Sequence, residues 1–249
     1  MASPAKMRLD QLLVDRGLVE TRSRAQAMIM AGNIYSDTKR LDKSGQQVKV
    51  DIVLEIKGQD HPWVSRGGLK LEKGLNDFNI SVEGKTCIDV GASTGGFTDV
   101  LLTNGAKKVY AVDVGQGQLA WKLRGDDRVE VMEKTNARYL TAKDIPDPID
   151  MIVCDASFIG LEIVLPAALD LAVPGAHVIA LIKPQFEVGK GRVGKGGVVR
   201  EPELHKEVCD RIEAWLGARE GWTVKGLTQS PIKGPQGNIE FLICGIFEG

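Results

Sequence analysis

From residue 86 onward, short apolar runs alternate with amphipathic segments, and this alternation restricts the possible fold more than any other feature. Helical patterns separate most of the runs, and no helix separates the last two. The pattern predicts an α/β fold with a doubly wound, mostly parallel, seven-stranded sheet whose last strand returns antiparallel. The expected strands are 86–90, 108–113, 128–132, 150–154, 176–183, 222–228 and 239–247, with helices over 96–103, 117–124, 160–171 and 202–217.

The first 60 residues have the pattern of a separate α+β unit. Two short helical segments, RLDQLLVDRG and RSRAQAMIMAG, stop at Gly17 and Gly32. Strand-like runs follow at NIYS, QVKV and IVLEI, with the polar turn DTKRLDKSGQ between the first two. We therefore expect a small domain over 1–60, a linker over 61–65 and the α/β domain over 66–249, which begins with a helix over LKLEKGLNDF.

Charge is unevenly distributed, although the net charge is only −1. Residues 1–75 carry 13 Lys and Arg against 9 Asp and Glu, a balance of +4, and the rest of the chain carries −5. Arg22 and Arg24 stand in the first turn of a predicted helix, where the helix dipole disfavours cations. Ordinary solvated surface and phosphate binding both explain such residues, and composition does not decide between them.

Several protein classes are disfavoured by the sequence. Its four cysteines have no C-x-x-C spacing and lie in strand or helix patterns, which argues against a disulfide framework or a metal site. The N-terminus has no apolar core of a secretion signal. Charges and prolines interrupt the most apolar stretch, 159–182, so that it does not match a membrane span. We expect a cytoplasmic protein without a metal.

A glycine-rich turn follows the first strand of the α/β part. In CIDVGASTGGF, Asp89 precedes Gly91, and Gly95 and Gly96 open the next helix. Glycines at such a turn let the backbone approach a ligand closely. Ser93 stands where dinucleotide-binding enzymes have their second glycine, which argues against NAD and FAD.

The second strand ends in Asp113, and an acid at this point can accept hydrogen bonds from both hydroxyls of a ribose. A ribose-binding acid without a pyrophosphate loop suits S-adenosylmethionine. The alternative is a Rossmann-like domain whose turn binds nothing, and the joint pattern favours a cofactor.

The segment GKGRVGKG, residues 189–196, nearly matches the phosphate-binding loop G-x-x-x-x-G-K-[ST]. Gly196 replaces the hydroxyl residue that would hold magnesium, and no helix follows at once. We interpret the segment as a loop in which Lys190, Arg192 and Lys195 are available to RNA phosphates.

Four ionisable residues fall at places that the predicted topology brings together. Lys70 lies in the helix before the first strand, Asp155 and Lys183 end the fourth and fifth strands, and Glu240 opens the last. Ligands of open α/β sheets bind at the carboxyl ends of strands. A ribose hydroxyl needs a base to attack a sulfonium methyl, and a lysine can act as one where burial and a nearby cation disfavour its charge. Each residue alone fits a structural ion pair equally well.

The N-terminal unit resembles the S4 RNA-binding module. The resemblance covers residues 7–57 and rests on the two helices, on RSRAQAMI and GNIY, and on the basic hairpin that follows. It implies contacts to RNA phosphates from Arg8, Arg22, Arg24, Lys39 and Arg40. Phosphate contacts position a protein on RNA but do not select a sequence.

The set Lys70, Asp155, Lys183 and Glu240 is similar to the tetrad of FtsJ-type RNA 2′-O-methyltransferases. With the S4-like unit, the chain resembles the TlyA (hemolysin A) family of ribosomal RNA methyltransferases; SRGGLKL, DVGASTGGFTDVLL, TNAR, KPQFEVGKG and GPQGNIE carry the resemblance. It implies a class I methyltransferase fold, S-adenosylmethionine as cofactor, and cytidines of 16S and/or 23S ribosomal RNA as targets. Further implied roles are Lys183 as base, Lys70 as its electrostatic partner, Asn136 at the adenine and Arg66 on RNA.

Three other functions are weighed against this one. A base methyltransferase would need a cysteine nucleophile or an Asn/Asp-Pro-Pro-Tyr-type clamp after the fourth strand, and CDASF has neither. A membrane-lytic protein, suggested by the name hemolysin, would need an amphipathic stripe or a span. An S4 adaptor with a silent methyltransferase domain would be favoured if any tetrad residue were apolar, and none is.

Overall fold

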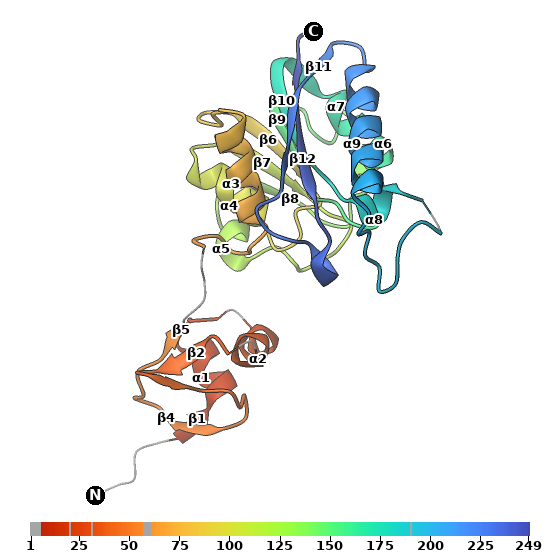
Figure 1. The fold of residues 1–249 in the computed structure, drawn as a ribbon. Coiled ribbons are helices and arrows are strands. Elements are labelled where there is room, and N and C mark those ends of the chain that lie inside the picture. Colours follow the sequence, from red (N-terminus) through yellow and green to blue (C-terminus); the bar gives the residue numbers. More distant parts are fainter. Residues whose placement is uncertain (1–5, 20, 31, 57–60, 190) are drawn as a thin grey trace, which may run out of the picture. The chain divides into compact units, whose positions relative to one another are not determined.

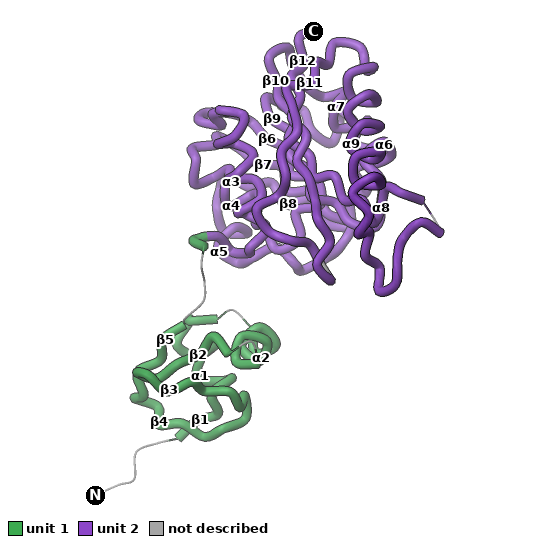
Figure 2. The backbone as a smooth tube through the Cα atoms, in the orientation of Figure 1, with its two compact units in different colours: residues 1–62 green, residues 63–249 purple. Residues whose placement is uncertain are grey.

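The computed structural model describes residues 6–19, 21–30, 32–56, 61–189 and 191–249. The chain divides into two compact units, residues 1–62 and 63–249 (Figure 2). Residues 63–65, expected in the linker, belong to the second unit. Trp63 is only 5% exposed and shares a buried cluster with Leu71 of the following helix. The Val64 N–H donates to Asp99 Oδ2 at 2.8 Å.

The described residues of the first unit form two helices and five short strands around a small apolar core that includes Leu9, Leu12 and Ile29. The two predicted helices are confirmed. The segment expected as one polar turn instead contains a strand, because the chain reverses at Asp37 (φ 52°) and Lys39–Arg40 pair with β2. The elements are β1 (Lys6–Arg8), α1 (Leu9–Asp15), α2 (Arg22–Met30), β2 (Ile34–Ser36), β3 (Lys39–Arg40), β4 (Gln47–Lys49) and β5 (Glu55–Ile56), with sheets β1-β4 and β3-β2-β5.

The second unit contains a seven-stranded sheet in the order β11-β12-β10-β9-β6-β7-β8 (Figure 1). The last strand, β12, is antiparallel to both of its neighbours, and the pairs from β10 to β8 are parallel, as predicted. The chain proceeds from β6 toward one edge and from β9 toward the other, so a crevice forms at the carboxyl ends of these two strands. The strands are β6 (Thr86–Val90), β7 (Lys108–Val112), β8 (Val129–Met132), β9 (Ile149–Cys154), β10 (Ala172–Ile182), β11 (Trp222–Gln229) and β12 (Phe241–Phe247).

Helices cover both faces of this sheet (Figure 1). One face carries α3 (Gly68–Asp77), α4 (Gly96–Thr103) and α5 (Trp121–Arg124), and the other carries α6 (Leu161–Val164), α7 (Pro166–Leu169), α8 (Pro184–Glu187) and α9 (Pro202–Gly217). Short 3₁₀ turns lie at Ala137–Tyr139 and Pro235–Gly237. Side chains alternate along each strand. Cys87 therefore packs on the α3 and α4 side, and Ile88 packs on the α6 and α9 side.

Several expected elements differ in extent. The helix expected over 117–124 is only α5, because Gly117 adopts a left-handed conformation (φ 71°). The helix expected over 160–171 is divided into α6 and α7 at Pro166, which has no N–H to continue the hydrogen-bond ladder. Strand β10 begins four residues earlier than expected, at Ala172, and α8 was not predicted. The helix expected over LKLEKGLNDF ends at Asp77, and Phe78, its expected last residue, lies after it and is half-buried.

Candidate active site

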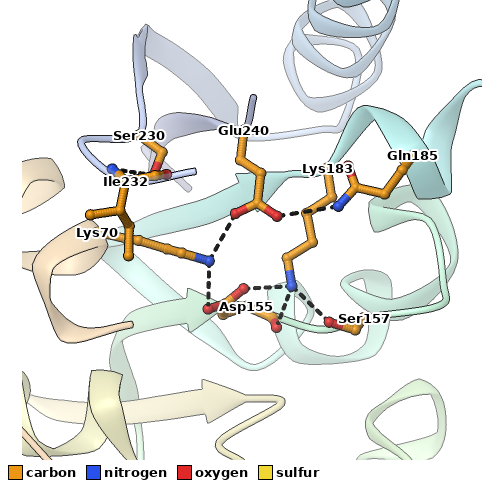
Figure 3. A network of polar contacts seen from close by, with 8 residues as sticks. All are labelled: Lys70, Asp155, Ser157, Lys183, Gln185, Ser230, Ile232 and Glu240. Carbon is orange, nitrogen blue, oxygen red and sulfur yellow. Dashed lines mark hydrogen bonds and ion pairs between the residues drawn. The ribbon is translucent and has the colours of Figure 1, made fainter. Parts of the chain in front are cut away.

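The four ionisable residues Lys70, Asp155, Lys183 and Glu240 form one connected network (Figure 3). Lys70 Nζ lies 2.8 Å from Glu240 Oε2 and 3.3 Å from Asp155 Oδ2. The other oxygen of Asp155, Oδ1, lies 2.6 Å from Lys183 Nζ. The two lysines and Glu240 are each less than a tenth exposed. The structure thus brings together the four residues that the sequence placed at the same end of the sheet.

Strand direction explains why these residues meet. Asp155 directly follows β9, and Lys183 directly follows β10, which is the parallel neighbour of β9. Because β12 is antiparallel to β10, its first residues lie beside the last residues of β10, and Phe241 pairs with Ile182. Glu240 therefore stands next to Lys183 at this edge, and Lys70 reaches both carboxylates from α3.

Lys183 Nζ has three oxygen partners. It donates to the Asp155 backbone carbonyl at 2.9 Å and to Ser157 Oγ at 2.8 Å, in addition to its ion pair with Asp155 Oδ1 at 2.6 Å. Three acceptors match the three N–H donors of an ammonium group.

Two polar residues that the sequence analysis missed complete the network. Ser157 contacts Lys183, and Gln185 Nε2 donates to Glu240 Oε1 at 3.2 Å. Each follows a tetrad residue by two positions, Ser157 after Asp155 and Gln185 after Lys183. The sequence signal that could have identified Ser157 and Gln185 is a polar residue two positions after a charged residue at the end of a strand.

Two cavities meet at this network. A cavity of about 250 Å³ is lined by residues that include Lys70, Asp155 and Lys183. A second cavity of about 450 Å³ extends along the carboxyl ends of β6 and β7 and reaches Asp113 and Asn136. Both cavities are lined by Gly91, Ser93, Asp155 and Ser157.

Asp113 lies in the larger cavity with acceptor capacity to spare. Its Oδ2 accepts the Ser93 N–H at 2.8 Å, and its Oδ1 accepts the Gly115 N–H at 2.7 Å. Each carboxylate oxygen has a second lone pair, so both can also accept a ligand hydroxyl. Asn136 Oδ1 caps the neighbouring 3₁₀ turn by accepting the Arg138 N–H at 3.1 Å.

Asp89 lines the smaller cavity and is fully buried. Its Oδ2 accepts the Thr98 N–H at 2.9 Å and the Thr98 hydroxyl at 2.7 Å. Its Oδ1 is buried with no hydrogen-bond partner in the described part of the chain. Burial raises the pKa of Asp89 to about 7, against the opposing effect of the Thr98 hydrogen bonds. An unpaired buried carboxylate oxygen at a cavity wall suits a ligand that carries a donor or a positive charge.

The glycines of the turn are required by close packing of the chain as well as by any ligand. Gly91 (φ 82°) lies so near Ala156 that a Cβ would stand 2.9 Å from the Ala156 Cα. At Gly95 (φ 95°), the N-cap of α4, a Cβ would stand 2.2 Å from Leu123 Cδ1. Gly96 lies against Ser65, which joins the segment before α3 to the turn.

An exposed aromatic side chain stands at the rim of the larger cavity. Phe158 is 89% exposed, has a left-handed backbone (φ 66°) and packs its ring 5.0 Å from that of Phe186. A bulky residue rarely adopts this conformation without constraint from its surroundings. An exposed ring of this kind can stack on a nucleobase, and the sequence analysis did not identify it.

In the first unit, a buried carboxylate holds two of the predicted RNA-binding arginines. Asp10 is fully buried and accepts two hydrogen bonds from Arg8, at 3.0 and 2.9 Å, one from Arg22 at 3.0 Å and one from Gln26 at 2.9 Å. These partners hold the pKa of Asp10 well below its usual range. The ion pair with Asp10 thus stabilises Arg22 in the first turn of a helix, where the helix dipole disfavours a cation. The side chains of Arg8 and Arg22 are 43% and 51% exposed.

The other predicted RNA-binding residues are scattered over the two units. Arg66 is exposed at the wall of the smaller cavity, and Arg192 forms a two-pronged ion pair with Glu207 of α9 at 2.5 and 2.7 Å. Lys190 lies outside the described residues. Of the rest, Lys39 and Arg40 are exposed on β3, Lys195 is exposed in the loop before α9, and Arg24 is half-buried on α2.

Within the described ranges, no group of three or more His, Cys, Asp or Glu side chains is arranged to hold a metal ion. No helix among the described residues has the length and apolarity to cross a membrane.

Comparison with known proteins adds independent observations. A family model described as FtsJ-like methyltransferase matches residues 63–247, and an S4 domain model matches residues 7–52. YqxC of Bacillus subtilis, whose name marks it as a candidate rRNA methyltransferase, is 54% identical over 96% of this chain and 85% of its own. TlyA of Mycobacterium tuberculosis, named as a 16S/23S rRNA (cytidine-2′-O)-methyltransferase, is 46% identical over 96% of this chain and 89% of its own. A solved structure from Streptococcus thermophilus, described as a candidate hemolysin, has 48% identity and a TM-score of 0.76, covering 99% of this chain and 90% of that one.

Proposed function

The chain belongs to the FtsJ-like methyltransferase family and carries an S4 domain before the methyltransferase unit, and from this we propose that it transfers a methyl group from S-adenosylmethionine to ribose 2′-hydroxyls of ribosomal RNA. The matches confirm the resemblance to the TlyA (hemolysin A) family and the methyltransferase class. The observation that carries the proposed reaction is the Lys70–Asp155–Lys183–Glu240 network at the junction of two cavities.

The larger cavity fits S-adenosylmethionine. Its volume of about 450 Å³ lies in the range of small-molecule sites. Asp113 would hold the ribose through the free lone pairs of its carboxylate, and Asn136 would lie at the adenine. In the adjoining smaller cavity, the unpaired Oδ1 of Asp89 suits the cofactor's ammonium group. When bound, the cofactor supplies a methyl group on a positively charged sulfur.

Lys183 is proposed as the general base. A ribose hydroxyl is a poor nucleophile until its proton is removed, and Lys183 Nζ lies where both cavities can reach it. Lys183 Nζ would take the proton of the ribose hydroxyl, and the bound cofactor would supply the methyl group that the hydroxyl oxygen accepts. Asp155 contacts both amines, and Glu240 anchors Lys70, which supplies a second positive charge at Asp155.

Ribosomal RNA is proposed as the substrate from the relatives' names together with the S4 domain of the first unit. The name of TlyA specifies cytidine ribose in 16S/23S rRNA, and we extend this target to the present chain. A silent methyltransferase domain is disfavoured because the four tetrad residues are present and connected. Other relatives carry the name hemolysin. No helix among the described residues is long and apolar enough to span a membrane.

Methylation mapping tests the proposed function. The purified protein, S-adenosylmethionine and ribosomal subunits from a strain lacking the gene should yield 2′-O-methylcytidine at defined positions, detected by mass spectrometry of nuclease fragments. Methyl groups found only on bases, or no methylation of subunits or of free 16S and 23S rRNA, would contradict it.

Cofactor affinity should depend on pH through Asp89. Its pKa of about 7 means that the carboxylate loses its negative charge as the pH falls below 7. If the cofactor's ammonium group binds the ionised form, affinity should fall about tenfold for each pH unit below 7. Calorimetry between pH 5.5 and 7 measures this slope. Asp89→Asn should bind weakly and without a slope, and a wild type whose affinity is constant over this range would rule out the contact.

RNA binding should depend on salt through phosphate contacts of the first unit. Replacing the exposed Lys39 with alanine should reduce the slope of log affinity against log salt concentration by about one unit. The control is Lys206→Ala, which removes an exposed lysine on α9 of the other unit. Fluorescence anisotropy with an rRNA fragment measures the RNA affinity of both variants at each salt concentration. Equal slopes in the Lys39 variant and the wild type would show that Lys39 does not contact RNA phosphates.

A further inference from the structure

The three partners of Lys183 Nζ differ in chemistry. Two belong to Asp155, its backbone carbonyl and its Oδ1, and the third is the hydroxyl of Ser157. A carbonyl directly after β9 is fixed by the sheet, and a carboxylate binds an ammonium through charge. The Ser157 hydroxyl is a neutral acceptor that can rotate and can also donate. It is therefore the partner that Lys183 can release most easily.

Ser157 also has a particular location. It lines both the smaller cavity, which contains the tetrad, and the larger cavity, which contains Asp113 (Figure 3 shows its contact with Lys183). The N–H of Lys183 that points to Ser157 Oγ is therefore directed at the junction of the two cavities. A neutral amine has two N–H groups and one lone pair, and the two Asp155 oxygens can hold both N–H groups. The lone pair then takes the direction of Ser157.

From this geometry we infer that Ser157 is a positioning residue for methyl transfer, a role that rests on the proposed function. Its hydroxyl holds the Lys183 amine at the junction and keeps the third N–H direction aimed at the place where the ribose hydroxyl must arrive. After the ammonium has lost a proton to solvent, the Ser157 hydroxyl rotates away, and the lone pair in that direction accepts the proton of the substrate hydroxyl.

The inference predicts two effects of Ser157→Ala. The single-turnover rate at high pH should fall by roughly threefold to tenfold, because a hydrogen bond that orients the neutral base is lost. The rise of the rate with pH should also shift to lower pH, because the ammonium has lost a hydrogen-bond acceptor. The charged groups around Lys183 (Asp155 after β9, Lys70 on α3 and Glu240 before β12) are unchanged in the variant.

The experiment compares single-turnover rates from pH 6 to 9 for the wild type, Ser157→Ala, Ser157→Thr and a matched control, Ser81→Ala, which removes an exposed hydroxyl before β6. Ser157→Thr keeps the hydroxyl and should restore both rate and profile. Cofactor and RNA affinities measured for all four proteins separate a slower reaction from weaker binding. If Ser157→Ala does not fold, Ser157→Cys provides the same test, because a thiol is a weak acceptor.

The outcomes separate this inference from the proposed function. A wild type that methylates RNA together with a Ser157→Ala rate and pH profile equal to those of the wild type would overturn the role of Ser157 alone. A reduced rate with an unshifted profile, or a Thr variant as slow as the Ala variant, would also overturn it. A wild type inactive on ribosomal RNA would instead contradict the proposed function.

Discussion

Lys183→Arg should reduce single-turnover methyl transfer by about a hundredfold or more while affinity for cofactor and RNA stays close to that of the wild type. Arginine keeps the positive charge that pairs with Asp155, so the network does not contain an unbalanced buried carboxylate. A guanidinium keeps its proton and has no lone pair to accept another. The variant thus removes the proposed base and leaves the electrostatics of the site nearly unchanged.

Lys70→Arg is the matched comparison, because Lys70 is assigned an electrostatic role and should tolerate a change that preserves charge far better. Rates measured with enzyme in excess over RNA separate chemistry from product release. In the wild type the rate should rise with pH, since only a deprotonated amine accepts a proton. A Lys183→Arg enzyme with a near-normal rate would show that Lys183 only supplies charge.

Asp113→Ala should weaken S-adenosylmethionine binding by about a hundredfold or more, because hydrogen bonds to a charged group contribute about 1.5–3 kcal/mol each and two ribose hydroxyls are involved. The same change removes the acceptor of the Ser93 and Gly115 N–H groups, which loosens the turns on both sides of the cavity. Asp113→Asn, which keeps one acceptor oxygen, should show an intermediate loss.

Calorimetry with S-adenosylmethionine measures these affinities. Asp127→Ala serves as control, because Asp127 is an exposed acid in the same unit that does not line the cofactor cavity. Wild-type affinity in Asp113→Ala would place the cofactor elsewhere in the unit, and circular dichroism measured in parallel would show whether the variant is folded.

Much of the fold follows from local patterns. A parallel sheet buried on both faces needs continuous apolar strands, and helices between them must present one apolar face, so the alternation from residue 86 onward predicts the α/β class. The same logic locates Asp113, Asp155 and Lys183, because polar residues that end apolar strands lie at the ligand-binding edge. Helix limits were less predictable where Gly117 and Pro166 act through backbone geometry.

The contacts that define the site depend on tertiary structure. Lys70 and Glu240 are 170 positions apart, and their 2.8 Å contact requires the strand order that sets β12 beside β10. Ser157 and Asp10 gain their roles only from neighbours brought by other elements. The residue types and their spacing indicated the proposed chemistry and placed it at the carboxyl ends of the strands. Strand order and register decided which atoms meet, because contacts between distant segments depend on how whole elements pack, which no local pattern encodes.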